Sequence, residues 1–148
     1  MGIMKKIVLA LLAAFLLCSV LPVYAQSEND PSSLIGLTLS DLIKTFGIPK
    51  NVYAVRGVAV WQDDVVFVYD RMEFFIFGNR VWQLKVHSAY SIKDGDSRAA
   101  VNSLMGEGRN YEGYTLYQLP GKAWPIMMRI NWDSAGRAAG IYIYRSDF

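Results

Sequence analysis

The hydrophobic pattern of this chain changes its period several times, and each change predicts an element. Over residues 38–46, apolar side chains recur at helical spacing behind Thr38, a residue type that caps helix N-termini. Gly47 then ends the pattern, and Pro49 prevents the helix from resuming. The pattern therefore predicts a short amphipathic helix.

The same frame returns over residues 97–105. Ser97 takes the place of Thr38 as the cap, Val101 lies on the apolar face, and Gly106 ends the pattern. The repeated pattern thus predicts a second short helix with an equivalent cap, an equivalent apolar face and a glycine at its end.

After each helix the hydrophobic period becomes two, which is typical of strands. Gly78-Asn79 suits a two-residue hairpin turn, and residues 133–136 suggest a matching turn. The predicted strands are 65–69, 73–77, 80–86, 114–119, 126–132 and 137–144.

These elements predict an α+β domain over residues 34–148. It would consist of two α-then-antiparallel-β-meander repeats, 34–92 and 93–148, with the helices packed on one face of an antiparallel sheet. Residues 26–33 are polar and predict a flexible lead-in.

Alternation also predicts which strand residues face the helices. Across the 133–136 turn, Ile130 would oppose Ala139 and Met128 would oppose Ile141, an all-apolar face. Carried back to the first hairpin, the buried set is Phe75, Phe77, Trp82, Leu84 and Val86. The outward set is Phe74, Ile76, Gln83, Lys85, His87, Met127, Arg129, Asn131, Tyr142 and Tyr144.

The first 25 residues predict a secretory signal peptide. Lys5 and Lys6 precede an apolar run, and a small residue at Ala25 suits cleavage after it. The run is shorter than the ~20 residues of a membrane span. Lipidation at Cys18, the only cysteine, is the alternative, but the bulky Leu17 directly before it argues against this. We therefore expect a periplasmic or secreted chain without disulfides or a stable membrane span.

Charge narrows the classes of partner. Lys and Arg number 15 against 13 Asp and Glu, and Lys5 and Lys6 account for the difference. The chain after Ala25 is therefore neutral overall and has no basic stripe, which argues against nucleic acid as a partner.

The stretch GLTLSDLIKTFGIP (36–49) resembles the opening of the SmpA/OmlA outer-membrane assembly lipoproteins. Two such units in tandem resemble the β-lactamase-inhibitor-protein fold. The resemblance implies an extracytoplasmic protein that binds other proteins and is not an enzyme. It does not carry over a partner, because those inhibitors have disulfides and those lipoproteins have an acylated cysteine at the mature N-terminus.

Candidate catalytic and metal-binding residues have simpler structural interpretations. His87, the only histidine, has no nucleophile-elbow pattern near it, and KDGDS (93–97) lacks the ligands that complete a calcium loop. Asp63 and Asp64 are adjacent, so they point apart at a strand entrance and suit a solvated loop. We therefore expect neither an enzyme nor a bound cofactor or metal.

The outward aromatic residues are the most informative, because Tyr, Trp and Arg dominate protein interfaces. We expect a protein-binding or inhibitory module acting through the open aromatic and polar sheet face. The alternatives are an envelope-assembly accessory protein, and a small-ligand binder or enzyme with a pocket between the repeats. The predicted partner-binding residues are Arg129, Asn131, Tyr142, Tyr144, Lys85, His87, Trp61 and Trp124.

Overall fold

A computed structural model describes residues 30–57, 59, 62–120 and 123–147. The predicted signal peptide, Cys18 and Trp61 lie outside the described residues, so signal cleavage, lipidation at Cys18 and a binding role for Trp61 remain predictions.

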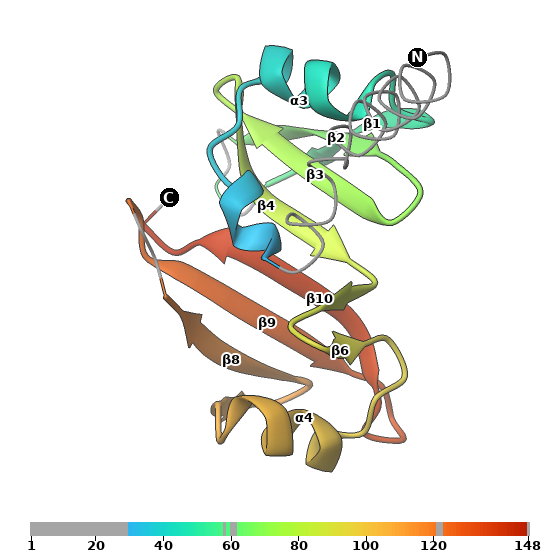
Figure 1. Ribbon diagram of the computed structural model, residues 1–148, viewed down its shortest axis with the longest axis vertical. Coiled ribbons are helices and arrows are strands. Elements are labelled where there is room, and N and C mark those ends of the chain that lie inside the picture. The colour runs from blue at the N-terminus through green and yellow to red at the C-terminus, as the bar shows by residue number, and fades with distance from the viewer. Residues whose placement is uncertain (1–29, 58, 60–61, 121–122, 148) are drawn as a thin grey trace, which may run out of the picture.

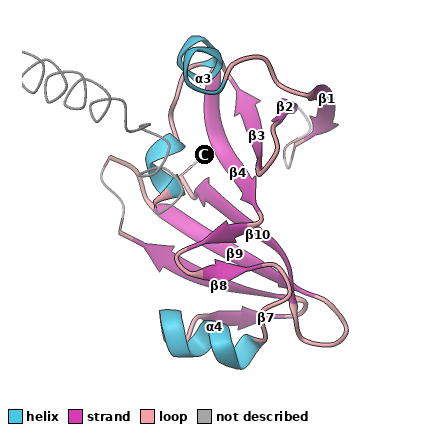
Figure 2. Cartoon of the chain, turned by 45° about the vertical axis from the view of Figure 1, so that its right-hand side comes forward, coloured by secondary structure: helices cyan, strands magenta, loops and turns pink. Residues whose placement is uncertain are grey.

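Eight antiparallel strands form one sheet in the order β1-β2-β3-β4-β10-β9-β8-β7 (Figure 1). A separate two-stranded hairpin pairs β5 (Ser88–Ala89) with β6 (Ile92–Lys93). Seen from a second direction, the large sheet twists strongly between β1 and β7 (Figure 2). Its strands are β1 (Asn51–Arg56), β2 (Asp63–Val68), β3 (Met72–Phe77), β4 (Arg80–Val86), β7 (Arg109–Tyr111), β8 (Tyr114–Leu119), β9 (Ile126–Trp132) and β10 (Ala138–Arg145).

Two α-helices form at the predicted positions, α3 (Leu39–Phe46) and α4 (Arg98–Met105). The side chain of Thr38 accepts a hydrogen bond from the backbone N–H of Asp41, and Ser97 does the same for Ala100. Both helices end at a glycine whose φ of 76° suits a residue without a Cβ. The predicted caps and stops are confirmed.

The predicted α+β fold of two helix-plus-meander repeats is wrong. Residues 83–86 of β4 pair with residues 141–144 of β10, so all the long strands merge into one sheet. The described helices are only α3, α4 and the 3-10 turn η1 (Pro31–Leu34). The fold is therefore predominantly antiparallel β, with short helical pieces at the ends and across one face of a single sheet.

One hydrophobic core covers one face of this sheet. Leu42 of α3, Phe74 of β3, Ile92 of β6 and Val101 of α4 are all fully buried in it. Leu34 of η1 belongs to the same core, and residues 31–33 of η1 fall within the segment 26–33 that was predicted as a flexible lead-in. Four separate pieces thus cover the face that the prediction assigned to two helices.

The predicted inward residues of β3 are reversed. Phe74 and Ile76 are buried, whereas Phe75 and Phe77 are only partly buried. A register shift between Phe75 and Ile76 interrupts the pairing of β3 with β4, and alternation carried from another hairpin cannot anticipate such a bulge.

The last hairpin has its predicted inward residues buried except Ala139, and its register differs from the prediction. Ile130 faces Ile141 and not Ala139. The carboxylate of Asp133 accepts a hydrogen bond of 2.8 Å from the N–H of Arg137, which holds a wider loop than predicted. A register shift follows this loop and leaves Ala139 exposed.

Candidate protein-binding face

One row of facing residues crosses all eight strands on the side of the sheet opposite the core. Residues paired across neighbouring strands point to the same face, so each step of the pairing adds one member. We call this side the outer face. From β7 to β1 the row is Arg109, Leu116, Arg129, Tyr142, Lys85, Glu73, Val68 and Asn51.

Arg129 lies in the middle of this row between two tyrosine rings. Its guanidinium carbon is 4.7 Å from the ring centroid of Tyr142 and 5.9 Å from that of Tyr114. The Nε atom is buried and has no hydrogen-bond partner. No carboxylate pairs with Arg129 in the part of the chain that the structure describes. The rings therefore hold a cation in a fixed orientation without a counter-charge.

A polar triad follows next along the row. Glu73 accepts hydrogen bonds of 2.7 Å from the hydroxyl of Tyr53 and from the ammonium of Lys85. Burial alone would raise the pKa of Glu73, but the hydrogen bonds from Lys85 and Tyr53 and the charge of Lys85 together lower it. Burial, and then the contact with Glu73, raises the pKa of Tyr53 to about 12. Lys85 is thus neutralised within the chain, unlike Arg129.

Tyrosine rings extend the outer face toward β7. Tyr111 stacks on Tyr114 with ring centroids 4.9 Å apart and ring planes at 12°. Tyr144 is half-buried beside Met127, and burial raises the pKa of its hydroxyl. The face is therefore a mixed aromatic and polar surface, as the alternation predicts.

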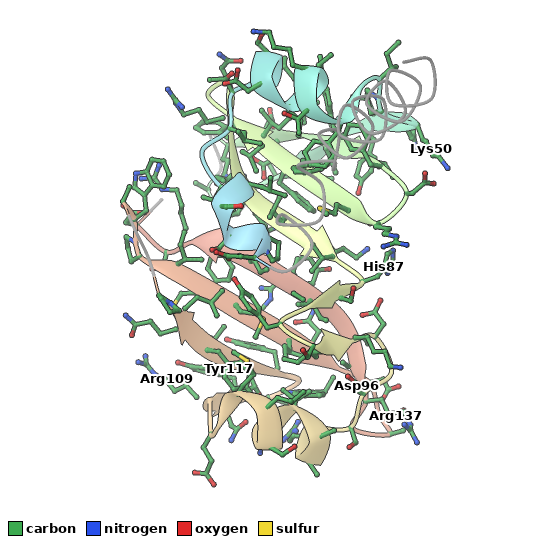
Figure 3. The ribbon with its side chains drawn as sticks, viewed as in Figure 1. Lys50, His87, Asp96, Arg109, Tyr117 and Arg137 are labelled. Atoms are coloured by element: carbon green, nitrogen blue, oxygen red, sulfur yellow. The ribbon has the colours of Figure 1, made fainter. Side chains whose placement is uncertain are left out.

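A hollow of about 250 Å³ lies at the corner where β7, β8 and α4 meet. Arg109 and Tyr117, both of which line it, lie at the same corner of the sheet (Figure 3). Leu116 and Met127 also line it, so the hollow continues the outer face at its edge.

Five of the predicted binding residues gather on this face. Arg129, Tyr142 and Lys85 belong to the row, Tyr144 pairs with Met127, and Asn131 pairs with Tyr114.

Two predicted binding residues lie outside the strands of the row. His87 follows the end of β4, where its Nδ1 is 2.8 Å from a carboxylate oxygen of Asp94, and its charge contributes to lowering the pKa of Glu73 on the outer face. Trp124 lies before β9, with the guanidinium carbon of Arg145 4.5 Å from its ring centroid. Trp124 also lines a second hollow of about 120 Å³ beside η1, on the core side, so it is not part of the outer face.

Sequence reasoning missed the tyrosines at the β7–β8 turn and the Tyr53–Glu73 pair. A usable signal was present in YEGY (111–114), where a two-residue turn with Gly113 at φ 78° sets two tyrosines opposite each other. No local signal marked Tyr53, because its partner Glu73 lies two strands away.

The prediction of a solvated Asp63-Asp64 pair holds for only one of the two residues. Asp63 is exposed and pairs with Arg56 at 3.0 Å. Asp64 is buried, and it accepts hydrogen bonds from the indole N–H of Trp82 at 3.1 Å and from the amide of Gln62 at 3.0 Å. Because strand residues alternate, Asp64 lies on the same side of β2 as Val66 and Val68, opposite the main core, and Val66 is buried there as well.

Within the described ranges, no group of three or more His, Cys, Asp or Glu side chains is placed to hold a metal ion. No helix among the described residues is long and apolar enough to cross a membrane.

The fold defines a single-sheet antiparallel β protein with its main core on one side. On the other side Tyr142, Arg129 and Leu116 are partly exposed, but Val66 and Asp64 of β2 are buried, so the outer face is not open over its whole width. The chain matches no protein-family model and no curated protein. Its fold is similar to part of a crystal structure determined at 1.5 Å resolution, that of an extracellular protein containing an SCP domain from Bacillus anthracis strain Ames.

That similarity has a TM-score of 0.53 and 11% sequence identity, and it covers 82% of this chain and 47% of the other. The chain therefore spans about half the length of that protein, and at this identity the likeness concerns the fold alone. It does not bear on the resemblance to the inhibitor and assembly-lipoprotein families, which stays a prediction.

Proposed function

We propose that this chain is an exported protein-binding or inhibitory module whose outer face binds another extracytoplasmic protein. The observation that supports this most is Arg129, held half-buried between Tyr142 and Tyr114 with no counter-charge from the chain. Arginine and tyrosine are the residue types enriched at the energetic centres of protein interfaces. Because the rings already fix the guanidinium, little conformational entropy is lost on binding.

The breadth of the outer face favours a protein partner over a small ligand. Two hollows lined by described residues have volumes of about 120 and 250 Å³, below the ~300–1,000 Å³ that ligand sites usually enclose. The larger of these two lies at the edge of the outer face, whose row of residues crosses all eight strands, and such a broad surface suits contact with a second protein.

Export is the second part of the proposal. The predicted signal peptide supports it, and the similar fold belongs to a protein described as extracellular. Mass spectrometry of the mature N-terminus tests it: we expect a chain that starts at Gln26. An acylated Cys18 would instead favour the envelope-assembly alternative.

Photo-crosslinking in the source cells tests binding by the outer face. We place p-benzoylphenylalanine at Tyr144 and, as a matched control, at Lys44 on the exposed side of α3. We expect a discrete adduct from Tyr144 only. The double variant Tyr142→Ala/Arg129→Ala should lose this adduct while its melting temperature stays within a few degrees of wild type. Absence of the adduct from Tyr144, or an equal adduct from Lys44, would refute the proposal.

A further inference from the structure

The charges of the outer face are not balanced along the row. Lys85 is paired with Glu73 at 2.7 Å. Arg129 and Arg109 have no carboxylate partner among the residues that the structure describes. The face therefore carries two arginines without an ion pair, although the chain after residue 25 is neutral overall and Glu107 lines the same hollow as Arg109.

The spacing of the two arginines is set by the sheet. Arg109 and Arg129 belong to the same row and are separated by one strand, which contributes Leu116 between them. Neighbouring strands lie ~4.8 Å apart, so the two backbone positions are roughly 10 Å apart. On the other side of Arg129, Tyr142 adds an aromatic surface.

The surroundings of the Arg129 guanidinium favour contact with an anion over full hydration. Its Nε is buried without a partner, and the rings of Tyr142 and Tyr114 remove part of its hydration. A cation that is half-desolvated and unpaired is costly. The buried Nε is out of reach of a second molecule, so an incoming carboxylate would offset this cost through parallel N–H···O bonds from the two terminal nitrogens of the guanidinium. A partner that supplies such a group would gain both affinity and orientation.

We propose that the partner presents an acidic helical segment to this face, with two carboxylates that pair with Arg129 and Arg109. This inference rests on the proposed function and adds the chemistry of the partner. Residues seven positions apart on one helix face are ~10.5 Å apart, which matches the spacing of the arginines. Apolar residues between the two acids would contact Leu116, and a neighbouring side chain would enter the hollow beside Arg109. Nucleic acid is disfavoured because only two separated arginines, with apolar surface between them, are available.

A model peptide tests the charge requirement. The probe is an alanine-based helical peptide with two glutamates seven positions apart and leucines between them. Its control is the same peptide with glutamine at both positions. Binding to the mature chain is followed by NMR through the Nε–H signal of Arg129. We expect the glutamate peptide to bind and to shift this signal, and the glutamine peptide to bind about a hundredfold more weakly, because it lacks both charged pairs and each contributes about tenfold.

Variants of the chain test whether the two arginines are the groups that bind the glutamates of the peptide. Arg129→Gln and Arg109→Gln should each weaken binding of the glutamate peptide about tenfold. Lys44→Gln, which removes an exposed charge on α3, should leave the affinity unchanged. Equal binding of the two peptides, no binding of the glutamate peptide, or equal effects of Arg129→Gln and Lys44→Gln would overturn the inference.

The crosslinking experiment distinguishes failure of the acidic-helix inference from failure of the proposed protein-binding function. If the adduct at Tyr144 forms in cells while the peptide results fail, the outer face binds a protein by other chemistry. If that adduct is also absent, both proposals are wrong.

Discussion

Glu73 is the residue at which the polar groups of the outer face meet. Its two carboxylate oxygens are used by different strands, one by Tyr53 of β1 and the other by Lys85 of β4. Glu73 therefore connects the edge strand β1 to β4, which is one of the two strands of the central pairing. We therefore expect ionisation of this one carboxyl to change the stability of the protein on both sides of neutral pH.

The triad should make the folded chain less stable at both acid and alkaline pH. The pKa of Glu73 is lowered in the folded chain, so the stability that its carboxylate contributes is present above pH 4.5 and is lost as pH falls through the folded pKa. The contact with Glu73, more than the opposing burial, raises the pKa of Lys85. Tyr53 also has a raised pKa, of about 12. The contributions of Lys85 and Tyr53 are therefore complete below about pH 10 and are lost at higher pH.

We expect Glu73→Gln to flatten both limbs of the stability profile. The free energy of unfolding at neutral pH should fall by ~0.5–1 kcal/mol, because the ion pair is only partly shielded from solvent. The measurement is urea denaturation between about pH 3 and 11. Asp70→Asn, which breaks the exposed pair with Lys50, is the control and should change little. A Glu73→Gln profile that follows wild type at both ends would show that the triad does not contribute to stability.

The helices illustrate how local signals combine with contacts at the scale of the element. Thr38 caps α3 and forms an isolated bridge with Arg80, whose guanidinium donates to the carbonyl oxygen of Gly36 at 2.8 Å. Ser97 caps α4 and forms the corresponding bridge with Arg137, which donates to Gly95 at 3.1 Å. Each helix therefore starts where a hairpin of the sheet holds the preceding chain.

Removal of either cap should cost a similar free energy. We expect Thr38→Ala and Ser97→Ala each to lower the free energy of unfolding by ~1 kcal/mol, because each leaves a backbone N–H of the first turn without its acceptor. The two helices lie at opposite ends of the sheet, so the double variant should show the sum. Urea denaturation checks this. The control Ser103→Ala, inside α4, should be neutral or slightly stabilising, since alanine favours helix. A double variant that differs from the sum by more than ~0.5 kcal/mol would show that the ends are coupled.

The elements could be predicted where pattern and burial agree. The helices were predicted because Thr38 and Ser97 cap clear apolar faces, and β4, β8 and β9 were predicted because one of their faces is buried. β1 was missed because nearly all of it is exposed, so it shows no alternation. The register of the last hairpin was wrong because a bulge beside Ala139 is not visible in a hydrophobic pattern.

The residues of the candidate site could be predicted where they lie on regular strands, but their contacts with other strands could not. Arg129 and Tyr142 were found because regular alternation on β9 and β10 fixes which face each residue occupies. His87, which was predicted on the outward side, lies just past the end of β4 beside Asp94, where alternation no longer fixes the direction of a side chain. The ring contacts of Arg129 depend on Tyr114 from a neighbouring strand, and pairing between strands is not encoded in either strand alone.

At the scale of the whole molecule, the pairing of β4 with β10 decides the architecture. It places Leu84 opposite Ile143, and both are fully buried in the single core. That core includes residues from η1, both helices and the small hairpin. The covered face thus joins the two ends of the sheet energetically, while Tyr142 and Tyr144 lie partly exposed on the other side.

This arrangement predicts that the chain unfolds as one cooperative unit. Ile143→Ala removes a fully buried side chain at the central pairing and should lower the free energy of unfolding by ~2–5 kcal/mol. The loss should appear as a lower midpoint of a single transition, because the same core supports both ends of the sheet. Coincident transitions by tryptophan fluorescence and far-ultraviolet circular dichroism would establish this. Tyr144→Ala, on the same strand but on the outer face, is the matched control and should cost less. Two separate transitions in Ile143→Ala would mean that each end of the sheet is stable alone, and the pairing of β4 with β10 would then be a contact between independent units rather than the centre of one core.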